Sequence, residues 1–203
     1  MSEAPSLVAY RPTGVRVLAA VLVADVLLVG IEVAAWLLRA TGSPGTWPDY
    51  RAETAGTWTS VLSAILYVAA IVAFFFWLGA TRRNLAAIGR PASWSGFWTY
   101  CGWFVPLAGF IVPYLVVRDL WKRAAPRRRA WPVAAWWLAW AAHAGMLPFA
   151  GRFLWAPVPE ALWPLVHEAS AVPAAGLVIV VTLTIDRGLR EQLGAVEAAP
   201  TRF

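Results

Sequence analysis

Four apolar stretches, each long enough to cross a lipid bilayer, constrain this chain more than any other feature. They cover residues 17–38, 57–80, 131–150 and 165–185. A helix needs about 20 apolar residues to cross a hydrocarbon core roughly 30 Å thick. Of the 203 residues, 60% are hydrophobic, whereas soluble domains are about 45 to 50% apolar. The sequence therefore predicts an all-α membrane protein, with one integral membrane domain over residues 1–185 and a charge-balanced tail over residues 186–203 that frays.

A fifth apolar segment, residues 95–117, differs from the others because Pro106, Gly109 and Pro113 interrupt it. Proline inside a helix removes a backbone hydrogen bond and clashes with the preceding turn, so we do not expect a continuous helix there. We predict a re-entrant hairpin that dips into the membrane, returns to the same side and is enclosed by the four spans. A full crossing would instead give five transmembrane helices, and a helix lying in the plane of the interface is a third possibility.

The placement of lysine and arginine distinguishes the topologies, because short loops rich in these residues stay on the cytoplasmic side. A re-entrant hairpin with cytoplasmic termini places 14 basic residues inside and three outside. Five full spans place at best 11 basic residues inside and six outside. The prediction is a multi-pass protein of the cell membrane with its N- and C-termini in the cytoplasm. Loops are expected over residues 40–56 and 151–164, which contain several glycines and prolines.

Two acidic residues, Asp25 and Glu32, lie inside the first predicted span. Their spacing of seven places them on one helix face, and Ser60, Ser63 and Tyr67 of the second span form a matching polar stripe. We expect Glu32 to lie near Ser63 and Asp25 near Tyr67. Ionisable residues inside a membrane mark either hydrogen-bonded contacts between helices or a site for protons or ions.

Histidine occurs at two positions, His143 in the third span and His167 at the start of the last, where Glu168 follows it. Two histidines and a carboxylate are ligands that zinc accepts, and two histidines on neighbouring helices are suited to haem. No close-spaced histidine motif accompanies them, so isolated, packed histidines are the alternative and no cofactor is expected.

The most basic loop follows the broken segment and is flanked by Trp121 and Trp131. Its cationic side chains are Lys122, Arg123, Arg127, Arg128 and Arg129. They are candidates for binding anionic lipid headgroups, and they also act as topology determinants. No nucleic-acid-binding module is present, so nucleic acid is not an expected partner.

The chain contains 14 tryptophans, a residue type that prefers the headgroup level. Trp103 and Trp140 are among four expected at greater depth, with Trp136 and Trp137. There they either pack against the broken segment or line an aromatic ligand pocket.

Several motifs recur in order along the chain: WLGATRRN at residues 77–84, WFVP at 103–106, PYLVVRDLW at 113–121, and Trp136, Trp137 and Trp140. In these motifs the chain resembles the actinobacterial membrane family called domain of unknown function 4328, over residues 18–185. The resemblance implies no activity, cofactor or catalytic residue. Gly109 departs from the family pattern, in which asparagine often follows the first proline of the broken segment.

The usual signatures of soluble enzymes, such as a phosphate loop or HExxH, are missing. We therefore expect a non-enzymatic envelope protein that binds lipid, a membrane partner or a second copy of itself. A small transporter or proton-coupled protein that uses Asp25 and Glu32 is the alternative. A metal- or haem-binding membrane protein that uses His143 and His167 is the third possibility.

Overall fold

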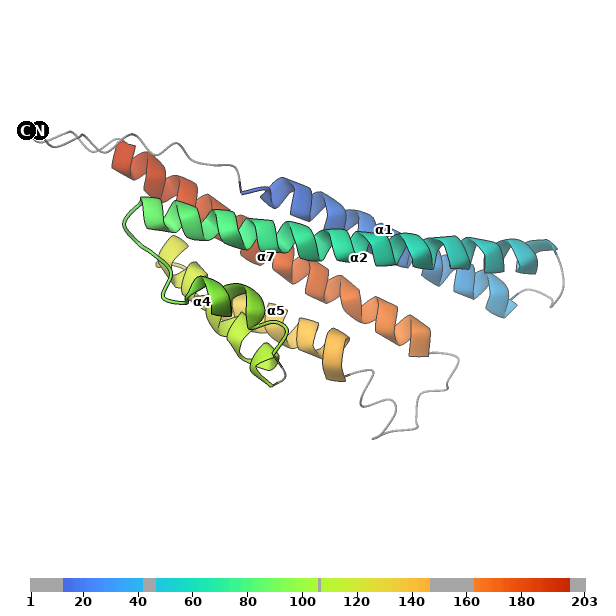
Figure 1. The fold of residues 1–203 in the computed structure, drawn as a ribbon. Coiled ribbons are helices and arrows are strands. Elements are labelled where there is room, and N and C mark those ends of the chain that lie inside the picture. The colour runs from blue at the N-terminus through green and yellow to red at the C-terminus, as the bar shows by residue number, and fades with distance from the viewer. Residues whose placement is uncertain (1–12, 42–46, 106, 147–162, 198–203) are drawn as a thin grey trace, which may run out of the picture. The chain divides into compact units, whose positions relative to one another are not determined.

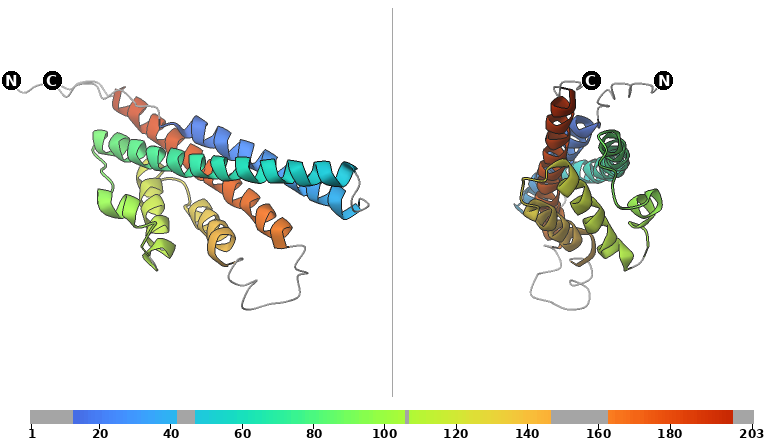
Figure 2. Two further views of the ribbon diagram at one scale, coloured as in Figure 1. Left: turned by 45° about the vertical axis from the view of Figure 1, so that its right-hand side comes forward. Right: turned by 90° about the vertical axis from the view of Figure 1, so that its left-hand side faces the viewer.

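The computed structural model describes residues 13–41, 47–105, 107–146 and 163–197. All regular secondary structure in these ranges is helical, with six α-helices, one 3-10 turn and one π-helical turn (Figure 1, with two further views in Figure 2). The predicted all-α fold is confirmed for this part of the chain.

The first two helices, α1 (Val15–Thr41) and α2 (Trp47–Ala87), are longer than the predicted spans. A loop is predicted through Gly56, but α2 already begins at Trp47. Pro48 suggested a turn, yet it occupies the first turn of α2, where the N–H that proline lacks has no helical partner in any case. At 1.5 Å per residue, the 41 residues of α2 extend for about 60 Å.

As predicted, residues 95–117 do not form one continuous helix. They contain α3 (Gly96–Cys101), the 3-10 turn η1 (Ala108–Phe110) and the first part of α4 (Val112–Ala124). Pro113 was expected to interrupt a helix, but it lies in the first turn of α4, where proline is tolerated. The helix then continues seven residues beyond the predicted end at Val117.

The third predicted span begins as α5 (Trp131–Ala141) and continues as the π-helical turn η2 (Ala142–Met146). Residues 147–150 of that span lie outside the described residues. The last helix, α7 (Trp163–Glu197), covers the fourth predicted span and has Pro173 in its interior. It also includes residues 186–197, so the prediction that the tail frays directly after the span is wrong.

Three helical segments are long and apolar enough to cross a membrane: Val15–Ala35, Thr57–Ala87 and Ser170–Ala195. They match the first, second and fourth predicted spans and indicate a multi-pass membrane protein. Large apolar side chains on these segments are well exposed, for example Val17 at 62% and Leu27 at 65%. Soluble proteins rarely expose such continuous apolar surfaces, whereas lipid tails cover them readily.

The chain divides into two compact units, each described by itself. The first unit contains Ala73–Trp137, Leu177–Phe203 and the residues up to Val15. Its core includes Trp77, Leu85, Val117, Leu120, Val133, Val181, Ile185 and Leu189, all at most 1% exposed. The second unit contains Arg16–Val72 and Leu138–Gly176. The broken segment and the basic loops therefore belong to the first unit, and Asp25, Glu32 and His143 belong to the second.

Candidate functional site

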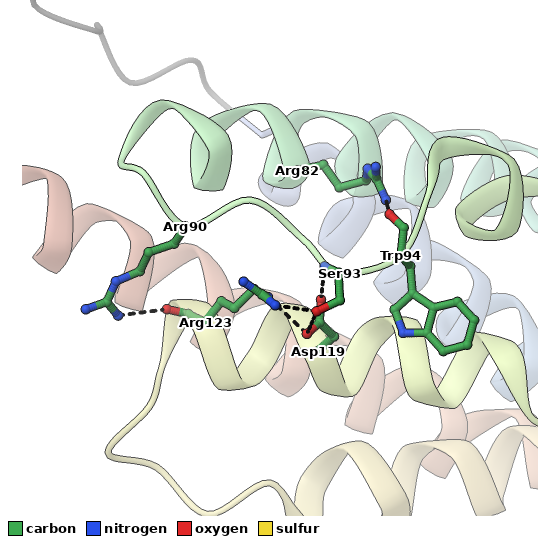
Figure 3. A network of polar contacts seen from close by, with 6 residues as sticks. All are labelled: Arg82, Arg90, Ser93, Trp94, Asp119 and Arg123. Carbon is green, nitrogen blue, oxygen red and sulfur yellow. Dashed lines mark hydrogen bonds and ion pairs between the residues drawn. The ribbon is translucent and has the colours of Figure 1, made fainter.

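The two ends of the broken segment are joined by a polar clasp of Ser93, Asp119 and Arg123 (Figure 3). The backbone N–H of Ser93 donates to Asp119 Oδ2 at 2.9 Å, and its hydroxyl donates to Oδ1 at 3.2 Å. Arg123, one turn after Asp119, donates from Nε to Oδ1 at 2.9 Å and from Nη2 to the Ser93 hydroxyl. Because residue 93 precedes the segment and residue 119 follows it, the segment is a hairpin whose ends meet.

A second set of contacts holds the first arm of the hairpin against α2. Arg82 Nη1 donates to the carbonyl oxygens of Trp94 at 2.6 Å and Ser95 at 3.4 Å, and also to Thr99 Oγ1. Thr99 is fully buried, and its own hydroxyl donates to Ser95 O at 2.8 Å. Arg82, from the WLGATRRN motif, therefore fixes where α3 begins.

Gly79 of the same motif lets α3 approach α2 closely. A Cβ at this position would lie 2.7 Å from the hydroxyl oxygen of Tyr100 and 3.4 Å from Arg83 Nη1. The Tyr100 ring packs on Phe75 of α2, with the ring centroids 6.0 Å apart. The missing side chain at Gly79 thus makes room for the tyrosine hydroxyl beside Arg83.

An aromatic cluster packs the turn of the hairpin against α2 and α5. Trp103 lies with its ring centroid 5.2 Å from Phe74, 5.8 Å from Phe75, 6.4 Å from Trp136 and 6.3 Å from Trp137. The indole N–H of Trp137 donates to Phe110 O at 3.0 Å. These contacts agree with packing against the broken segment for Trp103, Trp136 and Trp137. Trp140 belongs to the other compact unit, so its predicted place beside these residues stays a prediction.

The outer edge of the hairpin turn is exposed and apolar. Phe104 is 75% exposed and Leu107 is 82% exposed, and Phe110 and Ile111 are both more than half exposed. That the four spans enclose the turn stays a prediction. Leu107 also has φ of 62°, which is uncommon for a residue other than glycine.

The C-terminal end of α4 is capped by side chains from two other segments. Gln192 of α7 donates from Nε2 to the carbonyl oxygens of Arg123 at 2.9 Å and Ala124 at 2.5 Å. Arg90 Nη1 donates to Arg123 O at 3.4 Å (Figure 3). The last carbonyls of a helix have no partner within the helix, so these contacts satisfy them and position the basic loop that follows.

Five basic residues were predicted to bind lipid headgroups, and four of them have exposed side chains, namely Lys122, Arg127, Arg128 and Arg129. The fifth, Arg123, belongs to the clasp. Arg128 lies 3.9 Å from Glu191 of α7, and its carbonyl accepts a hydrogen bond from the Trp121 indole at 3.2 Å. The described part of the first unit contains 11 basic and four acidic residues, so this unit is strongly cationic.

In the second unit, α1 and α2 are linked by polar contacts. Ser63 donates to Asp25 Oδ1 at 3.1 Å, and Asp25 also interacts electrostatically with Tyr67. Asp25 therefore lies near Tyr67, as expected. Ser63 was expected near Glu32, but it hydrogen-bonds to Asp25 instead.

His143 lies on the π-helical turn η2, and its Nδ1 is 2.9 Å from Ser170 Oγ of α7. His167 and Glu168 lie in the first turns of α7, but their side chains fall outside the described residues. Among the residues whose side chains are described, no group of three histidine, cysteine or acidic residues is placed to hold a metal ion. The site of His143, His167 and Glu168 stays a prediction.

Sequence reasoning missed Ser93, Arg82 and Gln192. Arg82 and the clasp residue Asp119 were visible only as members of motifs, while Ser93 and Gln192 lie in polar segments without periodicity. Asp186 was also missed: it is 4% exposed, accepts from Thr13 Oγ1 at 2.6 Å and pairs with Arg190 at 2.8 Å. Charge counts place such residues on a side of the membrane, but they do not say which of them touch.

Comparison with known proteins gives one match. The family model described as "Domain of unknown function (DUF4328)" matches residues 46–187, which include both arms of the hairpin, the clasp and the aromatic cluster. No curated protein and no solved structure matches the chain significantly.

Proposed function

The chain belongs to the DUF4328 family, and from this membership and the geometry of the site we propose that it is a non-enzymatic, multi-span envelope protein that recognises anionic lipids. In this proposal the hairpin of residues 95–117 is re-entrant, and four spans surround or adjoin it. Its basic base, with the N- and C-termini, lies at the cytoplasmic surface of the cell membrane.

The clasp is the observation that carries this topology. A helix that crosses a 30 Å core separates its two ends by at least that distance, whereas Ser93 and Asp119 are joined by hydrogen bonds. From Asp119 back to Val112, α4 rises about 10 Å, so the turn reaches no deeper than about one leaflet. The geometry therefore supports a hairpin in one leaflet and not a fifth span.

The turn is suited to contact with lipid. Its apolar side chains point outward, and part of its backbone is satisfied internally, because the amides of Phe104, Gly109, Phe110 and Ile111 donate to backbone carbonyls. Internal satisfaction of the backbone is what a hydrocarbon environment demands. The exposed cations at the base of the hairpin lie where lipid phosphates would be, and each contributes about 1 kcal/mol near an anionic surface.

Cysteine accessibility in intact cells tests the topology. On a Cys101→Ser background, single cysteines replace the exposed residues Ala87 and Pro126 on either side of the hairpin, and Thr57 at the start of the second candidate span. We expect an impermeant reagent to label Thr57→Cys and to spare the other two. Labelling of Ala87→Cys and Pro126→Cys from opposite sides would establish a fifth span and refute the proposal.

Lipid recognition is tested by replacing Lys122, Arg127 and Arg129 with glutamine. Arg123 is kept because it holds the clasp. We expect weaker binding of phosphatidylglycerol to the purified full-length chain and no change in its fold. Unchanged binding would refute recognition through this loop.

A proton- or ion-coupled role is the second candidate, and the contact of Asp25 with Ser63 inside two candidate spans favours it. Burying an acid among apolar helices is costly and is commonly kept for a pathway or a partner. A flux assay in vesicles with Asp25→Asn and Glu32→Gln tests it, and undiminished flux would exclude both acids from a pathway.

A further inference from the structure

The seam between α2 and α3 contains two guanidinium groups that no described carboxylate neutralises. Arg82 donates only to neutral oxygens, those of Trp94, Ser95 and Thr99. Arg83 is exposed, and neither arginine forms an ion pair with a described residue. Arg82 is half-buried, and a cation removed from water without a counter-ion is unfavourable. The seam therefore has a net positive charge that an anion would compensate.

The same seam presents a hydroxyl at a fixed position. Tyr100 is held by its ring contact with Phe75, and its hydroxyl oxygen lies over Gly79, where Arg83 Nη1 also approaches. Guanidinium groups together with a hydroxyl are the donors that bind phosphate oxygens best. A side chain at position 79 would fill the place where the tyrosine hydroxyl and the guanidinium approach each other.

The surroundings indicate a lipid and not a soluble anion. On α3 and the turn after it, Phe97 is 62% exposed and Phe104 is 75% exposed, so an apolar surface adjoins the charged seam. Trp94 and Trp98 lie on the same arm of the hairpin, and tryptophan favours the headgroup level of a bilayer. A molecule with a phosphate head and acyl chains fits both surfaces at once.

We propose that Arg82, Arg83 and the Tyr100 hydroxyl form a binding site for the phosphate of an anionic phospholipid, separate from the loop of residues 122–129. This inference rests on the proposed recognition of anionic lipid and assigns a specific site to it. Gly79 keeps the site open, and α3 supplies the surface on which the acyl chains lie.

Native mass spectrometry of the detergent-solubilised full-length chain tests the site, with dimyristoyl phosphatidylglycerol as the probe. Arg83→Gln and Tyr100→Phe are the key variants, because neither removes a contact of the clasp or of the aromatic packing. We expect Arg83→Gln to weaken binding about tenfold, as loss of one charge-assisted contact does, and Tyr100→Phe to weaken it less. Arg187→Gln removes an equal charge from an exposed position on α7 and is expected to change nothing.

Arg82→Lys adds a further readout, because it keeps the charge but loses the fork of donors. We expect it to weaken binding while the unfolding temperature shows that the chain remains folded. If Arg83→Gln and Tyr100→Phe bind lipid as the parent does, the inference is wrong. If the Lys122, Arg127 and Arg129 variant loses lipid while these two do not, the proposed function stands and only the seam site falls. Two further results would overturn the assignment: Arg187→Gln weakens lipid binding as much as Arg83→Gln does, or inorganic phosphate alone raises the unfolding temperature as much as the lipid does.

Discussion

Gly188 shows how a single missing side chain determines the approach of two helices. A Cβ there would overlap the carbonyl oxygen of Ala124 and lie 2.9 Å from its carbon. We therefore expect Gly188→Ala to lower the free energy of unfolding by about 1 to 3 kcal/mol, as overpacking does. Gly194→Ala on the same helix has no atom within 4 Å and is expected to raise it by up to about 1 kcal/mol. Chemical unfolding in one detergent compares them, and equal effects would refute the close approach.

Thr81 gives the opposite kind of prediction. It is fully buried and its hydroxyl has no hydrogen-bond partner among the described residues, a situation that costs about 1 to 3 kcal/mol. Thr81→Val keeps the shape and removes the hydroxyl, so the free energy of unfolding should rise. Thr182 is equally buried, but its hydroxyl donates to Val178 O at 2.8 Å, so Thr182→Val should lower stability by about 1 kcal/mol. Destabilisation by Thr81→Val would mean that its hydroxyl is hydrogen-bonded in solution.

At the scale of elements, the clasp should determine whether the base of the hairpin stays closed. Asp119→Ala removes the acceptor of the Ser93 N–H and the ionic partner of Arg123. We expect amide exchange at residue 93 to become about tenfold faster or more, from the loss of charge-assisted hydrogen bonds. Hydrogen exchange read by mass spectrometry measures this.

The control for the clasp is Glu191→Ala, which removes an exposed carboxylate 3.9 Å from Arg128. Exposed ion pairs of this kind contribute little, so exchange at Ser93 should stay as in the parent. Exchange that is equally slow in Asp119→Ala would show that other contacts close the hairpin.

The elements differ in how far their sequence predicts them. Hydropathy located α1, α2 and α7 but ended them too early, because a helix continues through polar residues once tertiary contacts satisfy it. Gln192, which caps α4 from the supposed tail, is such a contact. Prolines were read as breaks, yet Pro48 and Pro113 lie in first turns, where only the residues around them distinguish a start from a stop.

Composition predicted which residues belong to the candidate site, but it did not predict which of them contact one another. The cations Lys122, Arg127, Arg128 and Arg129, which follow the hairpin, have exposed side chains in the first unit. The pairing of Asp119 with Ser93 joins residues 26 positions apart, and no local periodicity encodes such a contact. The contact of Asp25 with Ser63 joins two different helices, and counting depth along each helix does not supply it.

For the whole molecule, the exposed cations after the hairpin predict a stability that depends on the charge of the surrounding lipid. A ligand that binds only the folded chain stabilises it in proportion to its occupancy. We expect a higher unfolding temperature in phosphatidylglycerol than in phosphatidylcholine nanodiscs, and a smaller difference at 0.5 M salt, where the Debye length is only a few ångströms (~4 Å). If the variant with glutamine at Lys122, Arg127 and Arg129 shows the same difference in unfolding temperature, these cations are not responsible for it.

The closed base of the hairpin also bears on how the protein is made. On the proposed topology, residues 93 and 119 never separate, so the most basic part of the chain stays on the side where the ribosome releases it. The insertion machinery then transfers only the two segments around residues 39–56 and 151–162, which carry three arginines in all. A chain with so many cations can thus enter the bilayer while moving few charges through it, because the hairpin folds back before its charges have to cross.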